Sequence, residues 1–283
     1  MDSEPAAQPL GYGTAVLLGV VQGITEFLPI SSTAHLKVVP VLLGLGDPGV
    51  AVSAVIQLGT MVAVLLYFAR DILGLLRGGF AGLRGSVAHR RDLRLCVGIA
   101  LGTVPVVAAG LLGKKWISHE LRSLWVIAGA LTFFGLLLAL ADRRARTATR
   151  TSDDVGLGDA ILVGIAQMFA LIPGASRSGV TMTGALFLGL ERSAAARFSF
   201  LLSIPAITGA GLYELIRERR ALLDAGVGPL VVATVVSGLV GFLSIGALLR
   251  FLRTRSSMPF VVYRIALAAW IAYLLIQGKL ASG

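Results

Sequence analysis

Two stretches of this sequence place ionisable and hydroxyl side chains inside apolar surroundings. The first is Gln-Gly-Ile-Thr-Glu-Phe-Leu-Pro-Ile-Ser-Ser-Thr-Ala-His, at positions 22–35, and the second is Gln-Met-Phe-Ala-Leu-Ile-Pro-Gly-Ala-Ser-Arg-Ser-Gly-Val-Thr, at 167–181. Glu26 and His35 are the acidic residue and the histidine that lie well inside an apolar segment, and Arg177 is the basic residue deepest within a break. Ionisable groups at membrane depth are costly, so these three are candidates for function.

The spacing of these residues indicates an anion site. Gln22 and Glu26 share a helix face at i and i+4, as do Arg177 and Thr181. Each break opens a new half-helix, whose free N–H groups and positive dipole end attract anions. An arginine there is a bidentate phosphate clamp, and the carboxylate could hold a divalent cation or a proton. A Glu–Arg pair that only locks the two breaks together would not explain the hydroxyls and the imidazole.

The hydroxyl and imidazole groups suggest how a phosphate could be attacked. Ser32 and His35 are i and i+3 at the start of a helix, so His35 could accept the proton of Ser32. Ser32, His35 or a water molecule could attack phosphorus, and the sequence leaves the choice open. Gly174 and Gly179 would let the backbone approach the ligand closely.

The composition places these stretches in a membrane protein. The 283 residues are 56% hydrophobic and 14% charged, with a mean hydropathy of +0.85. A soluble domain carries about 25% charged residues. The net charge of +10 comes mostly from short basic clusters between apolar spans, a pattern that argues against nucleic-acid binding. The first ten residues lack a basic region, so we expect no cleavable signal, and Cys96 is expected to be a small core residue.

The apolar runs predict the fold class. Four runs, which flank the breaks at Pro29–Thr33 and Pro173–Ser178 in pairs, are too short to cross a bilayer. Paired short runs around a Pro/Gly/Ser break are typical of re-entrant hairpins. We therefore predict an all-α polytopic membrane protein with two re-entrant helical hairpins and six transmembrane helices at about 50–69, 94–113, 123–141, 197–216, 229–250 and 260–277.

The two halves of the chain resemble each other. The Gly19–Gln22 segment and the Pro-Ile-Ser that follows match Gly164–Gln167 and its Pro-Gly-Ala-Ser, and Gly44-Leu45 matches Gly189-Leu190. Interrupted segments in matching positions predict an inverted repeat with the site at the repeat interface. The prediction is a single integral membrane domain, 1–283, with repeat one at about 10–141 and repeat two at about 157–277.

Basic residues predict the orientation. If the first hairpin dips in from outside, fifteen arginines lie in the inner loops at 70–94, 143–150, 192–197 and 250–255, against seven Lys and Arg in the outer loops at 114–122, 217–220 and 279. The positive-inside rule favours this orientation, although the outer segment 217–220 is unexpectedly basic. The second hairpin then enters from the cytoplasm.

The two breaks carry the motifs of a known family. The chain lacks a Walker loop, a Cys/His metal cluster and a dinucleotide fingerprint, and the Gly98/Gly102 helix face indicates close packing. The [Glu/Gln]-x-x-x-Glu and F-L-P-x-S-S-T-x-H pattern at 22–35, and P-G-x-S-R-S-G-x-T at 173–181, resemble the bacitracin-resistance type undecaprenyl-diphosphatases, which are bacterial membrane phosphatases. The resemblance runs from about residue 10 to 277.

This resemblance implies hydrolysis of undecaprenyl diphosphate to undecaprenyl phosphate, the lipid carrier for peptidoglycan and other envelope polymers. It implies a site open to the periplasmic side of the bacterial plasma membrane and a divalent cation, Mg²⁺ or Ca²⁺. Gln22 replaces a common Glu, which puts a two-carboxylate metal site in doubt. The expected catalytic residues are Glu26, which would also bind the metal, Ser32, His35 and Arg177; the expected substrate-binding residues are Gln22, Ser31, Thr33, Gly174, Ser176, Ser178 and Thr181.

A second function remains open on the sequence alone. Inverted repeats with broken helices also build secondary transporters, so a transporter or a polyprenyl-phosphate flippase is the alternative. A Ser/His pair favours the hydrolase, because a transporter does not need one. The expected partners are the lipid bilayer and undecaprenyl diphosphate, without nucleic acid, and the oligomeric state is left open, with a homo-oligomer compatible with the sequence.

Overall fold

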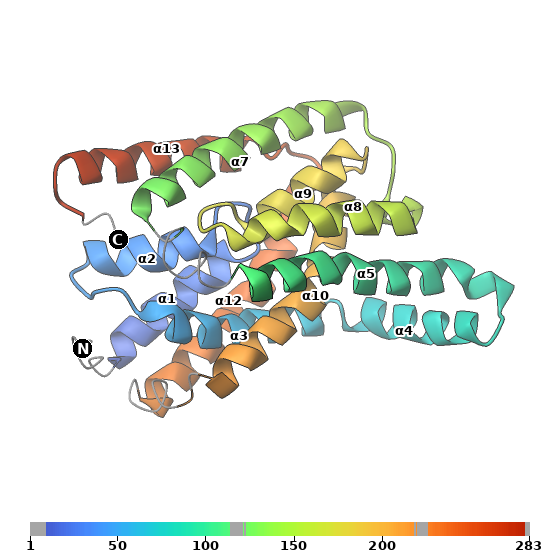
Figure 1. The fold of residues 1–283 in the computed structure, drawn as a ribbon, viewed down its shortest axis with the longest axis horizontal. Helices are drawn as coiled ribbons and strands as arrows, with labels where there is room; N and C mark the ends of the chain where they lie inside the picture. Colours follow the sequence, from blue (N-terminus) through green and yellow to red (C-terminus); the bar gives the residue numbers. More distant parts are fainter. Residues whose placement is uncertain (1–9, 114–120, 122, 218, 220–225, 281–283) are drawn as a thin grey trace.

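The computed structural model describes residues 10–113, 121, 123–217, 219 and 226–280. Its described residues form helices with short connections (Figure 1). The helices are α1 Tyr12–Thr25, α2 Ser32–Leu42, α3 Gly49–Tyr67, α4 Ala69–Leu83, α5 Arg90–Leu112, α7 Leu124–Arg144, α8 Leu157–Gln167, α9 Arg177–Phe187, α10 Arg192–Arg217, α12 Val227–Leu252 and α13 Met258–Ile276. Short 3₁₀ turns lie at Val87–His89, Ala145–Thr147, Ser152–Asp154 and Met168–Leu171.

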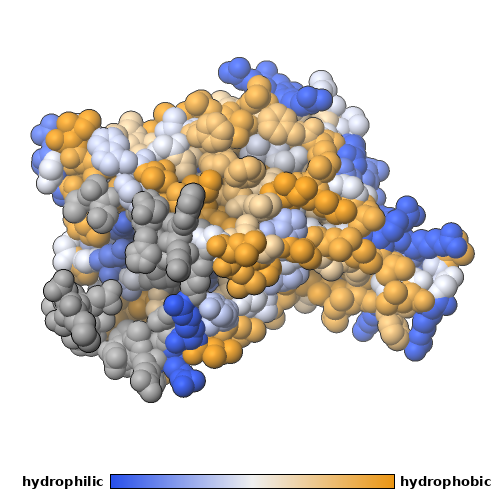
Figure 2. Space-filling model, viewed as in Figure 1, coloured by the Kyte–Doolittle hydropathy of each residue, from blue (hydrophilic) through white to orange (hydrophobic). Residues whose placement is uncertain are grey.

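The expected membrane class is confirmed. Among the described residues, five helices are long and apolar enough to cross a bilayer, and α3 with α4 adds a sixth if this pair, bent by 68°, counts as one span. Figure 2 shows apolar residues over much of the visible face, with hydrophilic groups gathered toward its margins. Exposed leucine, valine and phenylalanine side chains on these helices suit a lipid environment, because apolar surface is not exposed to water there.

The two short helix pairs fall where the hairpins are predicted. The chain leaves α1 at Thr25 and starts α2 at Ser32, and it leaves α8 at Gln167 and starts α9 at Arg177. α2 and α9 each have 11 residues, about 16 Å, too short to cross the hydrocarbon core. Two residues after the end of each helix stands a glycine of positive φ, Gly44 at 72° and Gly189 at 84°. The matched helices support a repeat, while its boundaries at 10–141 and 157–277 stay a prediction.

The two halves are interleaved. α1 from the first half packs along α12 from the second, and α8 from the second half packs along α5 from the first. Glycines make both contacts close: a Cβ on Gly23 would lie 2.9 Å from the amide nitrogen of Gly241, and a Cβ on Gly102 would lie 2.6 Å from the carbonyl oxygen of Ala160. The close-packing interpretation of the Gly98/Gly102 face is therefore confirmed.

Ion pairs join the predicted inner loops at one end of the molecule. Arg192, at the start of α10, donates to Asp142 near the end of α7 at 2.7 Å, and the same carboxylate accepts the amide of Ser257 before α13 at 2.8 Å. Arg197 pairs with Asp71 at the start of α4. The sequence-based grouping of these loops thus agrees with the fold, whereas residues 114–120, 122, 218 and 220 of the predicted outer loops lie outside the described residues.

Candidate active site

The two breaks share an unusual backbone conformation. Ser31 precedes α2 with φ 74° and Ser176 precedes α9 with φ 69°, and these are the non-glycine residues of positive φ in the described chain. Each serine caps its helix: the Ser31 hydroxyl accepts the amide of Ala34 at 3.4 Å, and the Ser176 hydroxyl accepts that of Gly179 at 3.2 Å. Positive φ costs a residue with a Cβ about 1–2 kcal/mol. Such strain clusters at functional sites, so it marks both breaks.

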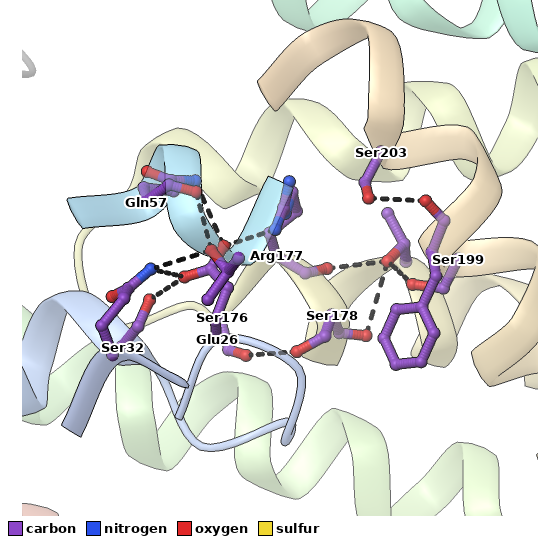
Figure 3. Close-up of polar contacts among 12 residues, drawn as sticks. Glu26, Ser32, Gln57, Ser176, Arg177, Ser178, Ser199 and Ser203 are labelled. Atoms are coloured by element: carbon purple, nitrogen blue, oxygen red, sulfur yellow. Dashed lines mark hydrogen bonds and ion pairs between the residues drawn. The ribbon is translucent and has the colours of Figure 1, made fainter. Parts of the chain in front are cut away.

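Glu26 lies at the meeting point of the two hairpins (Figure 3). Its Oε2 accepts hydrogen bonds from Gln22 Nε2 at 2.8 Å and from Ser32 Oγ at 2.6 Å. Its Oε1 accepts from Gln57 Nε2 at 3.1 Å and from the Arg177 guanidinium. The side chain is buried. A buried carboxylate needs partners of this kind, and here they come from both breaks and from α3.

Arg177 reaches Glu26 from the first position of α9, with 15% of its side chain exposed. One terminal nitrogen, Nη2, makes the ion pair, whereas Nη1 is buried and has no hydrogen-bond partner among the described residues. A buried cationic donor without an acceptor is costly. The free nitrogen therefore indicates a place for an anion beside Glu26.

Helix amides add to this anion-binding character. The first N–H groups of any helix have no partner within it. In α2 the Ser31 hydroxyl and carbonyl occupy the amides of Ala34 and His35, so those of Ser32 and Thr33 are left for a ligand. α9 repeats this arrangement, with Arg177 and Ser178 as the residues whose amides remain. Two helix N-termini and a guanidinium thus meet around one carboxylate, which suits a phosphate group.

The expected hydrogen bond between Ser32 and His35 is not formed. His35 Nδ1 bonds to the carbonyl of Ser31 at 2.7 Å, and Nε2 bonds to the hydroxyl of Tyr263 at 2.7 Å. Helical side chains lean toward the N-terminus, so the imidazole turns back over Ser31 while Ser32 points into the break. The hydrogen-bond partner of the Ser32 hydroxyl is therefore Glu26, at 2.6 Å, and the catalytic role of His35 stays a prediction.

The other predicted substrate-binding residues differ in their hydrogen-bond partners. Ser178 Oγ donates to the Leu28 carbonyl at 3.1 Å and so joins the two breaks. The Thr181 hydroxyl bonds to Ser199 of α10 and to the Arg177 carbonyl, and Thr33 is exposed and makes no bond to Glu26. Their roles toward substrate stay predictions.

The two break glycines serve packing. A Cβ on Gly174, which has φ 93°, would lie 2.5 Å from the carbonyl oxygen of Ile127 in α7. A Cβ on Gly179 would lie 2.8 Å from Arg264 Nη1. Both glycines thus allow close packing within the chain, and the expected close approach to a ligand stays a prediction.

Sequence reasoning missed three contributors to this site. Gln57 supplies a donor from within the apolar run of α3, Tyr263 holds the imidazole, and Arg264 is a fully buried arginine in the middle of α13. A usable signal existed for Arg264, because a lone ionisable residue within a span is a functional candidate by default. Gln57 and Tyr263 carry no charge and gave no comparable signal.

The described residues do not form a resident metal site. No group of three or more His, Cys, Asp or Glu side chains comes together within the described ranges. Glu26 is the lone carboxylate at the breaks, and both of its oxygens already accept two hydrogen bonds each. A divalent cation that takes part would thus draw most of its ligands from the phosphates of a substrate.

Comparison with known proteins places the chain in a family. Residues 15–270 match the family model described as bacitracin resistance protein BacA. An undecaprenyl-diphosphatase of Chlorobium phaeobacteroides is 50% identical over 94% of this chain and 98% of its own length. Those of Myxococcus xanthus and Gloeobacter violaceus are 52% and 49% identical over 94% and 96% of this chain, and over 90% and 95% of their own lengths. With nearly the whole chain covered, and both breaks inside the match, this protein belongs to the BacA family.

Proposed function

We propose that this membrane protein hydrolyses undecaprenyl diphosphate to undecaprenyl phosphate and inorganic phosphate. The observation that carries the proposal is the buried, unpartnered Nη1 of Arg177 beside the Ser32–Glu26 hydrogen bond. A terminal phosphate placed there meets a cationic donor, helix amides and a hydroxyl next to a base. Phosphoryl transfer needs such positioning and charge neutralisation more than any other help. Relatives named undecaprenyl-diphosphatase support the choice of substrate.

We propose Ser32 as the nucleophile, a role supported by its hydrogen bond to Glu26. Its oxygen forms a bond to the terminal phosphorus while the bond from phosphorus to the bridging oxygen breaks, and undecaprenyl phosphate leaves. The Ser32 proton passes to Glu26, 2.6 Å away, and then to the leaving phosphate. Water then attacks the phosphoserine, loses a proton to Glu26, and Ser32 recovers its proton as phosphate departs.

The divalent cation and the isoprenoid tail of the substrate would be bound mainly by groups outside the two breaks. A Mg²⁺ or Ca²⁺ ion would enter with the diphosphate and neutralise part of its charge, held mainly by phosphate oxygens. The isoprenoid tail would lie in lipid or along apolar helix faces, where burial of each CH₂ is worth about 0.8 kcal/mol.

We further propose that the first break opens to the periplasmic side of the bacterial plasma membrane. The arginine distribution supports this orientation. Single cysteines at the exposed positions Leu43 and Thr147, in a Cys96→Ala background, should be labelled from opposite sides of intact cells. An impermeant maleimide should label position 43 and spare 147, and the reverse pattern would invert the orientation.

The direct test of the reaction is phosphate release by the purified protein in detergent. Detergent removes the two compartments, so transport cannot be measured there. A transporter of the same architecture, without phosphatase chemistry, would release no phosphate. We expect release from undecaprenyl diphosphate that is lost in Glu26→Gln. The absence of release from the wild-type protein, with substrate and Mg²⁺ present, would reject the proposed function.

A further inference from the structure

One side chain outside both breaks contacts both of them. Arg264 on α13 is 0% exposed, and its guanidinium has no carboxylate partner among the described residues. Instead its three nitrogens donate to five main-chain carbonyls at 3.0–3.3 Å: Pro29 from Nη1, Leu131 from Nε, and Ala130, Gly174 and Ala175 from Nη2. These carbonyls belong to the first break, to α7 and to the second break.

The chemistry of the two partners is complementary. A break at membrane depth leaves carbonyl groups without helical donors, and each unpaired group there costs several kcal/mol. A buried guanidinium without a counter-ion is equally unfavourable alone. Arginine presents five N–H donors in a rigid fork, so one side chain can satisfy carbonyls from several segments at once. A lysine, with one nitrogen, could not reach all three segments.

Arg264 also sets the direction of the break amides. In a trans peptide, the carbonyl of one residue and the N–H of the next point in opposite directions. The Ala175 carbonyl points at Arg264, so the N–H of Ser176 points away from it and away from the packed layer between α7 and α13. The positive φ of Ser176 follows directly after this peptide. The fork therefore orients the start of the α9 anion-binding end.

We propose that Arg264 is a positioning residue that fixes the two breaks relative to each other, and with them the alignment of Ser32 and Glu26 with Arg177. The inference rests on the proposed phosphatase function only for its kinetic readout. Arg264 itself bonds to main-chain carbonyls and to neither Glu26 nor Ser32. Its loss should lower kcat more than it raises KM, because misalignment by about 1 Å can cost about 100-fold in rate.

Gly179, which lies against the guanidinium of Arg264, offers a second way to displace that guanidinium. A Cβ on Gly179 would lie 2.8 Å from Arg264 Nη1 and 3.1 Å from Ser176 Cβ, so Gly179→Ala should displace the guanidinium, its nearest neighbour, without removing any polar group. Gly129 in α7 has no atom within 4 Å of its ideal Cβ, so Gly129→Ala is the matched control. For the arginine itself, Arg192→Met is the control, because it also breaks a buried bonding network but at the far end of the helices.

The kinetic experiment measures kcat, KM and Tm for these full-length variants in detergent. Arg264→Lys and Gly179→Ala should lower kcat at least about tenfold with KM within about threefold. Arg192→Met should lower Tm with little change in kcat, and Gly129→Ala should change neither. Retained kcat in folded Arg264→Lys or Gly179→Ala would overturn the proposal, as would an equal loss of kcat in Arg192→Met.

A distance measurement keeps the proposal separate from the reaction. Spin labels are attached to single cysteines at Leu42 in α2 and Leu162 in α8, both exposed, in a Cys96→Ala background. Double electron–electron resonance then measures the distance between the two hairpins. Arg264→Lys should broaden or shift the distance distribution, and Gly129→Ala should not. An unchanged distribution would overturn the positioning role. If wild-type protein releases no phosphate but the distribution broadens, the proposed function fails and the positioning role stands.

Discussion

The two breaks share a capping conformation and carry opposite charges. Each has a capping serine of positive φ, 74° at Ser31 and 69° at Ser176, and each opens an 11-residue helix. The first break contributes the anionic Glu26 and the second the cationic Arg177. The matched caps thus supply two anion-attracting helix ends, and a single residue on each side makes one break anionic and the other cationic.

The glutamines before the two breaks, Gln22 and Gln167, also differ in their surroundings. Gln22 donates to Glu26 at 2.8 Å, whereas neither the nitrogen nor the oxygen of the buried Gln167 side chain has a hydrogen-bond partner among the described residues. Four residues after each glutamine stand Glu26 and Leu171. The second break therefore lacks the group that its glutamine would bond. The comparison predicts that a change at Gln22 acts on catalysis as well as stability, and that the matched change at Gln167 acts on stability alone.

The largest effect is expected from the hydroxyl–carboxylate pair of the first break. Ser32→Ala and Glu26→Gln should each reduce phosphate release at least about 10³-fold, since one supplies the nucleophile and the other its base. The double variant should be hardly worse than the weaker single, because the two residues act as a unit. His35→Ala should stay within about tenfold, the worth of one hydrogen bond. A His35→Ala loss that exceeds that of Ser32→Ala would return the nucleophile or base role to His35.

The next effect tests the cationic side of the comparison. Arg177→Lys keeps the charge but loses the planar fork, so it cannot bond to Glu26 and to a phosphate at the same time. We expect kcat/KM to fall about 10²–10³-fold, as for the loss of one donor to a transition-state oxyanion. Thermal unfolding should show that the variant is folded. Turnover near that of wild type would contradict the clamp.

Matched glutamine variants compare the two breaks directly. Gln167→Leu removes two unpartnered buried polar atoms, so the free energy of unfolding should rise or stay equal, by up to about 1–3 kcal/mol, with activity retained. Gln22→Leu removes a donor to Glu26 and should lower both stability and activity. Tm and phosphate release in one detergent give both answers. A destabilised, inactive Gln167→Leu would mean that the second glutamine has a partner of its own, such as a bound water.

The smallest effects concern the capping serines. Glycine relieves the positive φ and costs little at an N-cap, so Ser31→Gly and Ser176→Gly should change stability by less than about 1 kcal/mol. Alanine keeps the strain and loses the cap, at a cost of about 0.5–2 kcal/mol. Each glycine variant should thus unfold at a higher temperature than its alanine counterpart. The opposite order at either position would mean that the serine hydroxyl matters more than the backbone strain.

Much of this architecture was predictable because bilayer thickness fixes span length. The apolar runs predicted the five long spans of the described residues, with α3 and α4 as a sixth if the bent pair counts as one, and the polar residues at 22–35 and 167–181 predicted the two short helix pairs. The positive φ of Ser31 and Ser176 had no such signal, since glycine is the residue expected there. The contacts of Arg264 are with main-chain carbonyls, which every residue has, so no side-chain pattern could identify them. The hydrogen bonds of His35 to Ser31 and Tyr263 could not be predicted, because helical spacing gives proximity and not the direction of a ring nitrogen.

The interleaving of α1 with α12, and of α8 with α5, imposes an order on biosynthesis. The first hairpin leaves the ribosome early, but its packing partner α12 begins at Val227 and its counter-charge is Arg177. At about 5–20 residues per second, roughly 10–40 s pass between synthesis of α1 and synthesis of α12. During that interval the polar break lacks both its ion pair and the close glycine contact between α1 and α12. We therefore expect the first hairpin to reach its final position only after the later helices are inserted. The surroundings of Glu26, which is made early, are thus completed by Arg177 and α12 from the second half of the chain.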